Sequence, residues 1–156
     1  MNKQTALLLA IPISWWGFRM VRKLTENKDK SADILARTIW GEARGEGIHG
    51  MQAVANVIMN RVKKGGWWGA TVEDVCKKPA QFSCWNTSDP NYPKIQSVTT
   101  DDTQFRQALN IAKLAVSGNL SDITGEATHY HSIAVKPAWA DKLVLTTRIG
   151  DHLFYA

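Results

Sequence analysis

The sequence predicts an α+β protein, mostly helical, with a small β element towards the C-terminus. The chain has 156 residues, of which 44% are hydrophobic, and this suits one globular domain with a sizeable core. Apolar residues recur at helical spacing between residues 31 and 116, whereas the segments after residue 126 are short and rich in β-branched and aromatic residues. Helices first and strands last is an order typical of the α+β class.

The first predicted helix begins at Ser31 and runs to about Arg44. Ser31 is a suitable N-cap, and Asp33 places a negative charge in the first turn, where the helix dipole favours it. Gly45 and Gly47 then break the helical pattern. The polar stretch before Ser31 is interpreted as a linker.

The second predicted helix has the clearest pattern in the chain and ends at Gly65 and Gly66. Its apolar residues are Met51, Val54, Ala55, Ile58 and Val62. A separate polar line on the same helix consists of Gln52, Asn56 and Asn60. Such a line is usually solvated, and one of its members could face a cleft.

Thr71 begins a capping sequence for a short helix. A long loop with several aromatic residues follows from residue 81 to about residue 100, and long loops in compact domains are often functional. Asp101 or Asp102 caps another helix, which Gly118 closes. The predicted strands lie within residues 127–133, 143–149 and 153–155.

The positive charge of the chain is concentrated near its N-terminus. Residues 1–30 hold six Lys and Arg against two Asp and Glu, whereas residues 31–156 hold 13 against 12. A nucleic-acid-binding protein carries its basic residues on the folded part, so this distribution argues against nucleic acid as a partner. It favours a membrane surface or another anionic polymer near the N-terminus.

Residues 5–18 carry no charge and are rich in Leu, Ile and Trp, like the apolar region of a signal peptide or signal anchor. Basic residues follow directly at 19–23, and no small-x-small cleavage site is present, so a simple cleaved signal is disfavoured. The run is also shorter than the ~20 residues of a full membrane span. We expect residues 1–30 to be a leader, either a membrane anchor or a helix in an assembly, and residues 31–156 to be the folded domain.

Glu42 lies at the end of the apolar face of the first predicted helix. The apolar-face residues before it, three to eight positions upstream, are Ile34, Leu35, Thr38 and Ile39. On a 3.6-residue period Glu42 shares the face that the helix buries. Burial disfavours the charged form of a carboxylate, as a general acid near neutral pH requires. Glu42 is therefore a candidate catalytic acid, and the alternative is a glutamate that pairs with Arg44 or caps the next helix.

Cleavage of a glycosidic bond needs a proton donor and usually a second carboxylate. Glu46 is the nearest second carboxylate, although Gly45 breaks the helix between it and Glu42. In peptidoglycan the substrate can replace it, because the C6 hydroxyl of N-acetylmuramic acid can attack its own anomeric carbon. Sugars also need aromatic faces and hydrogen-bonding groups. Residues of suitable type are Gln81, Phe82, Ser83, Trp85 and Tyr130.

Metal and thiol chemistry are the competing interpretations. His129 and His131 form an H-x-H pair, whose rings share one face of an extended strand. No Asp or Glu stands at a motif spacing, so we predict no metal and no cofactor. Cys84 with either histidine could imitate the dyad of a cysteine peptidase. Cys76 and Cys84 are the only cysteines, and their spacing leaves open a disulfide or two reduced thiols.

Four stretches of the chain carry recognisable motifs. They are I-W-G-E-A-R-G-E-G at 39–47, G-M-Q-A-V-A-N-V-I-M-N-R-V at 50–62, Q-F-S-C-W at 81–85 and I-G-D-H-L-F-Y at 149–155. In this order they resemble the SleB-like cell wall hydrolases, a family that includes spore-cortex-lytic enzymes and phage endolysins or virion lysins. The resemblance covers about residues 32–156 and leaves the leader outside it.

The resemblance implies a lysozyme-like catalytic domain related to lytic transglycosylases. Such an enzyme cleaves the β-1,4 bond between N-acetylmuramic acid and N-acetylglucosamine and leaves 1,6-anhydromuramic ends. The resemblance implies that Glu42 is the catalytic residue. It also implies that the substrate groove is lined by Gln81, Phe82, Ser83 and Trp85. Tyr130 falls where similar proteins carry an aromatic segment followed by Asn-Pro, but His131 and Ser132 follow it here. Glu46 is left as a supporting residue.

We therefore expect a protein that acts on peptidoglycan and faces the periplasm or cell wall. It would be a phage endolysin anchored at the membrane by residues 5–18, or a virion-associated lysin. One alternative is a hydrolytic muramidase with Glu46 as its second carboxylate. Another is a non-catalytic wall-binding or structural virion module.

Overall fold

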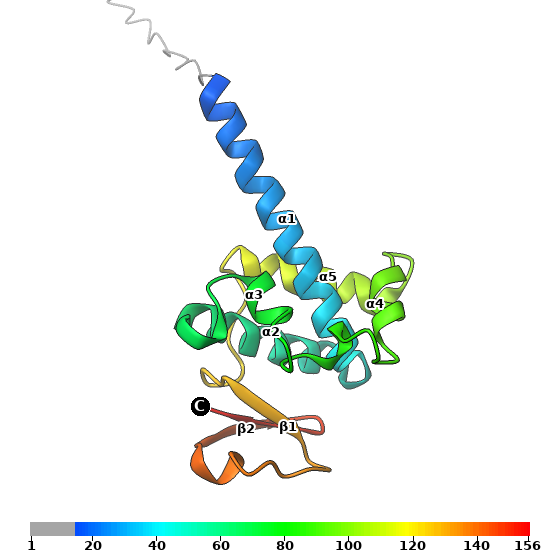
Figure 1. The fold of residues 1–156 in the computed structure, drawn as a ribbon, viewed down its shortest axis with the longest axis vertical. Helices are drawn as coiled ribbons and strands as arrows, with labels where there is room; N and C mark the ends of the chain where they lie inside the picture. The colour runs from blue at the N-terminus through cyan, green and yellow to red at the C-terminus, as the bar shows by residue number, and fades with distance from the viewer. Residues whose placement is uncertain (1–14) are drawn as a thin grey trace, which may run out of the picture.

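The computed structural model describes residues 15–156 as a helical body with a small sheet at one end (Figure 1). The helices are α1 (Trp15–Ala43), α2 (Gly47–Lys64), α3 (Val72–Cys76), α4 (Tyr92–Ser97) and α5 (Thr103–Val116). The strands are β1 (His129–Ser132), β2 (Leu145–Ile149) and β3 (His152–Tyr155). Single 3₁₀ turns are η1 (Arg44–Glu46), η2 (Gly66–Trp68), η3 (Ser83–Trp85) and η4 (Ala140–Lys142). The predicted α+β class, mostly helical with its β element near the C-terminus, is confirmed.

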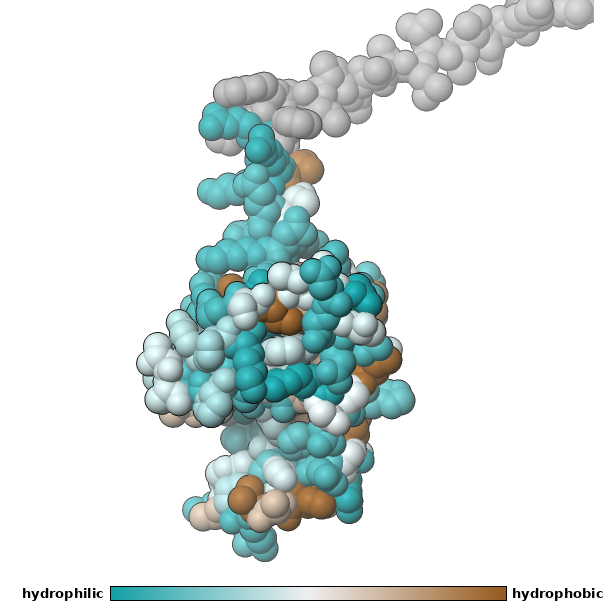
Figure 2. Space-filling model, turned by 90° about the vertical axis from the view of Figure 1, so that its right-hand side faces the viewer, coloured by the Kyte–Doolittle hydropathy of each residue, from teal (hydrophilic) through white to brown (hydrophobic). Residues whose placement is uncertain are grey.

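Helix α1 begins well before Ser31, so the predicted linker and N-cap there are wrong. No glycine or proline interrupts residues 18–40, and Arg22 pairs with Glu26 one turn later at 2.9 Å, so the helix continues through the polar stretch. Residues 19–30 are exposed and project from the body as a mostly hydrophilic stalk (Figures 1 and 2). From residue 31 onward, α1 is packed in the core.

The predicted apolar anchor at residues 5–18 lies outside the described residues, apart from the backbone of its last turn in α1. Within residues 15–156, no helix combines the length and the apolar character that a membrane span needs.

The second half of α1, helix α2 and helix α5 pack together around the main core. Fully buried members from these helices include Leu35, Ile39, Met51, Val54, Ile58, Ala108 and Ala112. As predicted, α2 ends where Gly65 caps it. Its polar line fastens the helix to the loop after α5: Asn56 donates to the carbonyl of Ser121 at 3.1 Å and accepts from the amide of Ile123 at 3.1 Å. Asn60 donates to the carbonyl of Ala127 at 3.0 Å, so these amides serve the fold.

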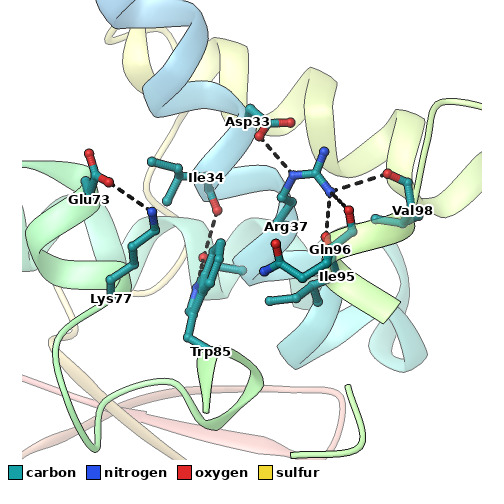
Figure 3. Close-up of polar contacts among 10 residues, drawn as sticks. Asp33, Ile34, Arg37, Glu73, Lys77, Trp85, Ile95, Gln96 and Val98 are labelled. Atoms are coloured by element: carbon teal, nitrogen blue, oxygen red, sulfur yellow. Dashed lines mark hydrogen bonds and ion pairs between the residues drawn. The ribbon is translucent and has the colours of Figure 1, made fainter. Parts of the chain in front are cut away.

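Side-chain caps define the short elements that follow. Thr71 and Asp74 form the predicted capping box of α3. Asp102 is the N-cap of α5, which settles the choice between the two adjacent aspartates. The predicted long loop contains η3 and α4, which are too short to produce a helical period. Arg37 on α1 closes α4 by donating to the carbonyls of residues 95, 96 and 98 (Figure 3).

The three strands form an antiparallel sheet in the order β1-β3-β2. All three lie at the segments predicted from β-branched and aromatic residues. In the central strand, Phe154 is fully buried and packs with Ala53 and Val57 of α2. This contact joins the sheet to the helical body.

Gly41 lies on α1 where η3 and α4 approach the helix most closely. A Cβ at this position would lie 2.9 Å from the Cβ of Cys84 and 3.0 Å from Cγ2 of Ile95. Both neighbours are buried, so neither can move without disturbing the core. The absence of a side chain at residue 41 is therefore what allows these segments to pack against α1.

We expect Gly41→Ala to lower the free energy of unfolding by about 1–3 kcal/mol, the usual cost of overpacking a core. Urea denaturation measures the change. Gly45→Ala is the matched control, because nothing lies within 4 Å of a Cβ added there. The control should change the free energy of unfolding by no more than about 0.5 kcal/mol. Equal losses in the two variants would contradict the packing argument.

Glu73 joins the base of the α1 stalk to α3. Its carboxylate accepts hydrogen bonds from Lys30 at 2.6 Å and from Lys77 at 2.9 Å. These hydrogen bonds lower the pKa of Glu73 from 4.5 to about 2. Because the pKa is depressed in the folded protein, the stabilisation is present above about pH 4.5 and is lost as the pH falls towards 2.

Glu73→Gln should lower the free energy of unfolding at pH 7 by up to about 1 kcal/mol, since the pairs are solvent-exposed. The difference from the parent should shrink between pH 4.5 and pH 2 as the carboxylate of the parent is protonated. Denaturation curves at several pH values test this. Glu126→Gln removes a more exposed ion pair, with both side chains 77% exposed, and should have a smaller effect. A difference that persists unchanged at low pH would rule out the ion pairs as its cause.

Candidate active site

Glu42 lies in the last turn of α1, where three parts of the chain meet. The amide N–H of Cys84 in η3 donates to Oε1 at 3.4 Å, and the hydroxyl of Tyr130 in β1 donates to Oε2 at 3.3 Å. The side chain is half-buried, at the edge of the core rather than inside it. Each carboxylate oxygen therefore has its own donor, while part of the group is open to solvent.

Arg44 does not pair with Glu42. Its guanidinium stacks on Trp40 at 4.3 Å and donates to the carbonyls of Trp40 and Gly41 and to the side chain of Asn91. Among residues 15–156, no lysine or arginine forms an ion pair with Glu42. The alternative interpretation, in which Glu42 pairs with Arg44, is therefore wrong, because other residues bind the guanidinium of Arg44.

Tyr130 is positioned by aromatic packing on its strand. Its ring stacks on Phe154 with centroids 5.7 Å apart, and His152 meets its edge at 5.3 Å. Burial raises the pKa of Tyr130 well above 10, and the nearby charge of Glu42 adds to the effect. The phenol therefore stays protonated at neutral pH and acts as a hydrogen-bond donor to Glu42.

Residues 81–85 form one flank of Glu42, and their side chains have different surroundings. Ser83 is exposed, and its hydroxyl helps to lower the pKa of Asp89. Trp85 is half-buried against α1, where its Nε1 donates to Thr38 at 2.9 Å (Figure 3). Phe82 is only 2% exposed, so its ring packs beneath this flank as part of the core.

Arg61 contacts both flanks of the site, although the sequence analysis named it only as a member of the motif at residues 50–62. Its guanidinium donates to the carbonyl of Thr128 at 2.8 Å and to Oε1 of Gln81 at 3.1 Å. It thereby connects α2 with both flanks of the site. Burial lowers its pKa to about 10, so it remains charged at neutral pH. The available signal was a lone arginine beside the apolar face of a core helix.

Glu46 forms a hydrogen bond with a segment near the C-terminus of the chain. Its Oε2 accepts from the amide of Asp151 at 2.9 Å, in the turn between β2 and β3. A Cβ at Gly150 would lie 2.0 Å from the same oxygen, and the φ of Gly150 is +56°, so this turn requires glycine for two reasons. The contact ties η1 to the sheet, which makes Glu46 a positioning residue for the hairpin.

The predicted H-x-H pair does share one face of β1. The ring of Trp139 lies 5.1 Å from His129 and 5.5 Å from His131. His131 also bonds to the hydroxyl of Tyr155 at 3.0 Å. Within the described part of the chain, no three His, Cys, Asp or Glu side chains are grouped so as to hold a metal ion.

Cys76 and Cys84 are both buried as free thiols. Burial raises the pKa of Cys76 to about 12 and raises that of Cys84 further above its ordinary value. A nucleophilic cysteine needs the opposite shift, because the thiolate is the reactive form. The environment of Cys84 therefore does not suit the cysteine-peptidase alternative.

Known proteins are similar to this chain in sequence and in fold. A family model described as cell wall hydrolase matches residues 45–155, beginning just after Glu42. The spore cortex-lytic enzyme of Halalkalibacterium halodurans is 31% identical over 127 residues, covering 81% of this chain and 34% of that protein. The chain thus spans about a third of the length of this curated relative.

Two solved structures are similar over the same share of the chain. They are the catalytic domain of the SleB protein of Bacillus cereus and the catalytic domain of the germination-specific lytic transglycosylase SleB of Bacillus anthracis. Each has a TM-score of 0.62 and 28% sequence identity, over 81% of this chain and 89% and 93% of those chains, respectively. Since the family match spans most of the folded domain and the fold agrees, the chain belongs to the cell wall hydrolase family.

Proposed function

We propose that this protein is a peptidoglycan lytic transglycosylase whose catalytic acid and base is Glu42. The observation that carries the proposal is the placement of Glu42, half-buried and hydrogen-bonded by Tyr130 and the amide of Cys84. A carboxyl group oriented in this way, with part of its surface open, suits proton transfer to a bound substrate. The similarity to a protein described as a lytic transglycosylase supports the reaction class.

In the proposed reaction, protonated Glu42 donates its proton to the glycosidic oxygen between N-acetylmuramic acid and N-acetylglucosamine. The bond from C1 of the muramic residue to that oxygen breaks, and N-acetylglucosamine leaves with a free C4 hydroxyl. The C6 hydroxyl of the same muramic residue attacks C1 and closes a 1,6-anhydro ring. Its proton passes to the carboxylate of Glu42 and restores the acid. No water is consumed, so a single glutamate suffices.

The groove candidates take different parts in this proposal. Gln81, Ser83 and Trp85 offer an amide, a hydroxyl and an aromatic ring on one flank of Glu42, and Tyr130 lies on the other. These groups suit the hydroxyls, N-acetyl groups and apolar faces of sugars. Phe82 supports the flank from the core. Glu46 acts indirectly, through its bond to the β2–β3 turn.

The leader favours localisation of the protein at a membrane or in a virion. The exposed start of α1 carries Arg22, Lys23 and Lys28, and cations near an apolar segment favour an anionic lipid surface. We therefore propose a phage endolysin held at the membrane through residues 5–18 and the α1 stalk. Association with a virion through the same segment is the second arrangement that this leader suits.

Glu42→Gln keeps the shape of the side chain and removes its proton. We expect at least about a hundredfold loss of wall-degrading activity, because general acid catalysis contributes about that much or more. Turbidity loss of purified cell walls measures the rate, and mass spectrometry of the products should show 1,6-anhydromuramic ends for the parent. Undiminished lysis by this variant would remove Glu42 from the mechanism.

Glu46→Gln is the matched control. It also distinguishes the proposed transglycosylase from a hydrolytic muramidase that uses Glu46 as its second carboxylate. The proposal expects most of the activity to remain and the products to stay anhydro. Reducing muramic ends, together with a loss in Glu46→Gln as large as that in Glu42→Gln, would identify a muramidase with two carboxylates. A parent protein that binds walls without cleaving them would identify the non-catalytic wall-binding or structural module.

Tyr130→Phe removes the hydroxyl that orients Glu42. We expect kcat to fall about tenfold, since a hydrogen bond to a charged group contributes about 1.5 kcal/mol or more. Tyr155→Phe is the control, because the hydroxyl of Tyr155 contacts His131 instead. Its kcat should stay within about twofold of the parent, because no contact with Glu42 is lost. Equal kcat values in the two variants would show that the Tyr130 contact does not assist the reaction.

A further inference from the structure

The turn after α2 displays tryptophan at the surface. Gly65, Gly66 and Gly69 all have positive φ values, which glycine adopts without strain, and they flank the 3₁₀ turn that contains Trp67 and Trp68. Trp67 is 65% exposed and is the only aromatic residue among the exposed large hydrophobic side chains of the described chain. Exposing an indole forgoes the stabilisation that its burial would contribute, so the fold itself does not explain this display.

Trp67 begins a continuous series of ring contacts across three parts of the chain. Its centroid lies 4.8 Å from that of Trp68, which lies 5.2 Å from His129. The ring of His129 in turn lies 5.1 Å from Trp139, in the connection between β1 and β2. We call these four residues, Trp67, Trp68, His129 and Trp139, the aromatic ledge.

The aromatic ledge adjoins one flank of Glu42 through Arg61. The guanidinium of Arg61 lies 4.3 Å from the ring of Trp68 and also donates to Gln81 on one flank. His129 precedes Tyr130 in β1, so the two side chains point to opposite faces of the strand. The ledge therefore meets the proposed groove on the side of Gln81, with Arg61 between them.

The surroundings of the ledge are basic. The ammonium group of Lys78 lies 4.5 Å from the ring of Trp67, and Arg61 lies beside Trp68. Burial, Arg61 and Lys64 together lower the pKa of His129, so its imidazole is neutral, and its Nδ1 already bonds to the hydroxyl of Thr128 at 3.0 Å. Peptidoglycan strands offer matching groups: apolar sugar faces, hydroxyls, and the carboxylates of the peptide stems or, where no stem is attached, of muramic acid itself.

We propose that the aromatic ledge is a second contact surface for the glycan strand, on which sugar rings stack beyond the residues that flank Glu42. This inference rests on the proposed function, because it takes a peptidoglycan strand as the substrate. The ledge lengthens the bound strand, which favours polymeric walls over short fragments.

The test uses the full chain carrying Glu42→Gln, so that the wall is not degraded during the measurement. In this background Trp67→Leu keeps an apolar side chain and removes the aromatic face, whereas Trp67→Phe keeps a flat ring. Val144→Ala alters another exposed apolar residue, 72% exposed and not part of the ledge, and is the control. Affinity is measured by co-sedimentation with purified walls and by titration with soluble glycan strands freed of peptide stems.

We expect Trp67→Leu to weaken binding to both materials by about tenfold, equivalent to about 1.4 kcal/mol. Trp67→Phe should retain most of the affinity, and Val144→Ala should bind like its parent. Circular dichroism confirms that each variant is folded. Unchanged binding by Trp67→Leu, or equal binding by the Leu and Phe variants, would overturn the proposal.

Binding to vesicles of anionic lipid tests the competing explanation, that the exposed tryptophan contacts a membrane. If Trp67→Leu loses vesicle binding and keeps its affinity for glycan strands, the exposed tryptophan contacts membranes and the proposal is wrong. A failure of this kind leaves the catalytic assignment intact, because cleavage is tested separately with Glu42 restored.

Discussion

The close contact between α1 and the segment that contains η3 is the constraint on which the rest of the site depends. It exists because Gly41 has no side chain where Cys84 and Ile95 approach the helix. The next residue along α1 is Glu42, and the amide that reaches it belongs to Cys84. Core packing and placement of the carboxylate are thus consequences of the same contact.

A second set of contacts brings the sheet to this junction. Phe154 packs on α2, Arg61 donates to the carbonyl of Thr128 at the start of β1, and Glu46 accepts from the β2–β3 turn. These contacts place Tyr130 beside Glu42, although 88 residues separate the two in the chain. Both flanks of the site are therefore fastened to the helical body, through α1, η1 and α2.

Sequence patterns predicted most of the fold and only part of the site. The ends of α2, the capping box at Thr71 and the three strands depend on local residue order, and they lie where the patterns predicted. The N-cap at Ser31 was wrong because an N-cap residue can also continue a helix when no breaker precedes it. Phe82 and Ser83 are adjacent, yet one is buried and the other exposed, and spacing alone did not separate them.

Local residue order was sufficient to predict α2, the caps of α3 and α5, the three strands and the helical phase of Glu42, because helical phase and turn chemistry are properties of neighbouring residues. What surrounds that carboxylate depends instead on how distant segments pack. Arg44 was the obvious partner by proximity, but it is held by Trp40 and Asn91, and the donors to Glu42 come from residues 84 and 130. The aromatic ledge also depends on tertiary packing, since its four rings come from three separate segments. Contacts between distant segments depend on how elements pack, and packing follows from the shape and volume of the whole core.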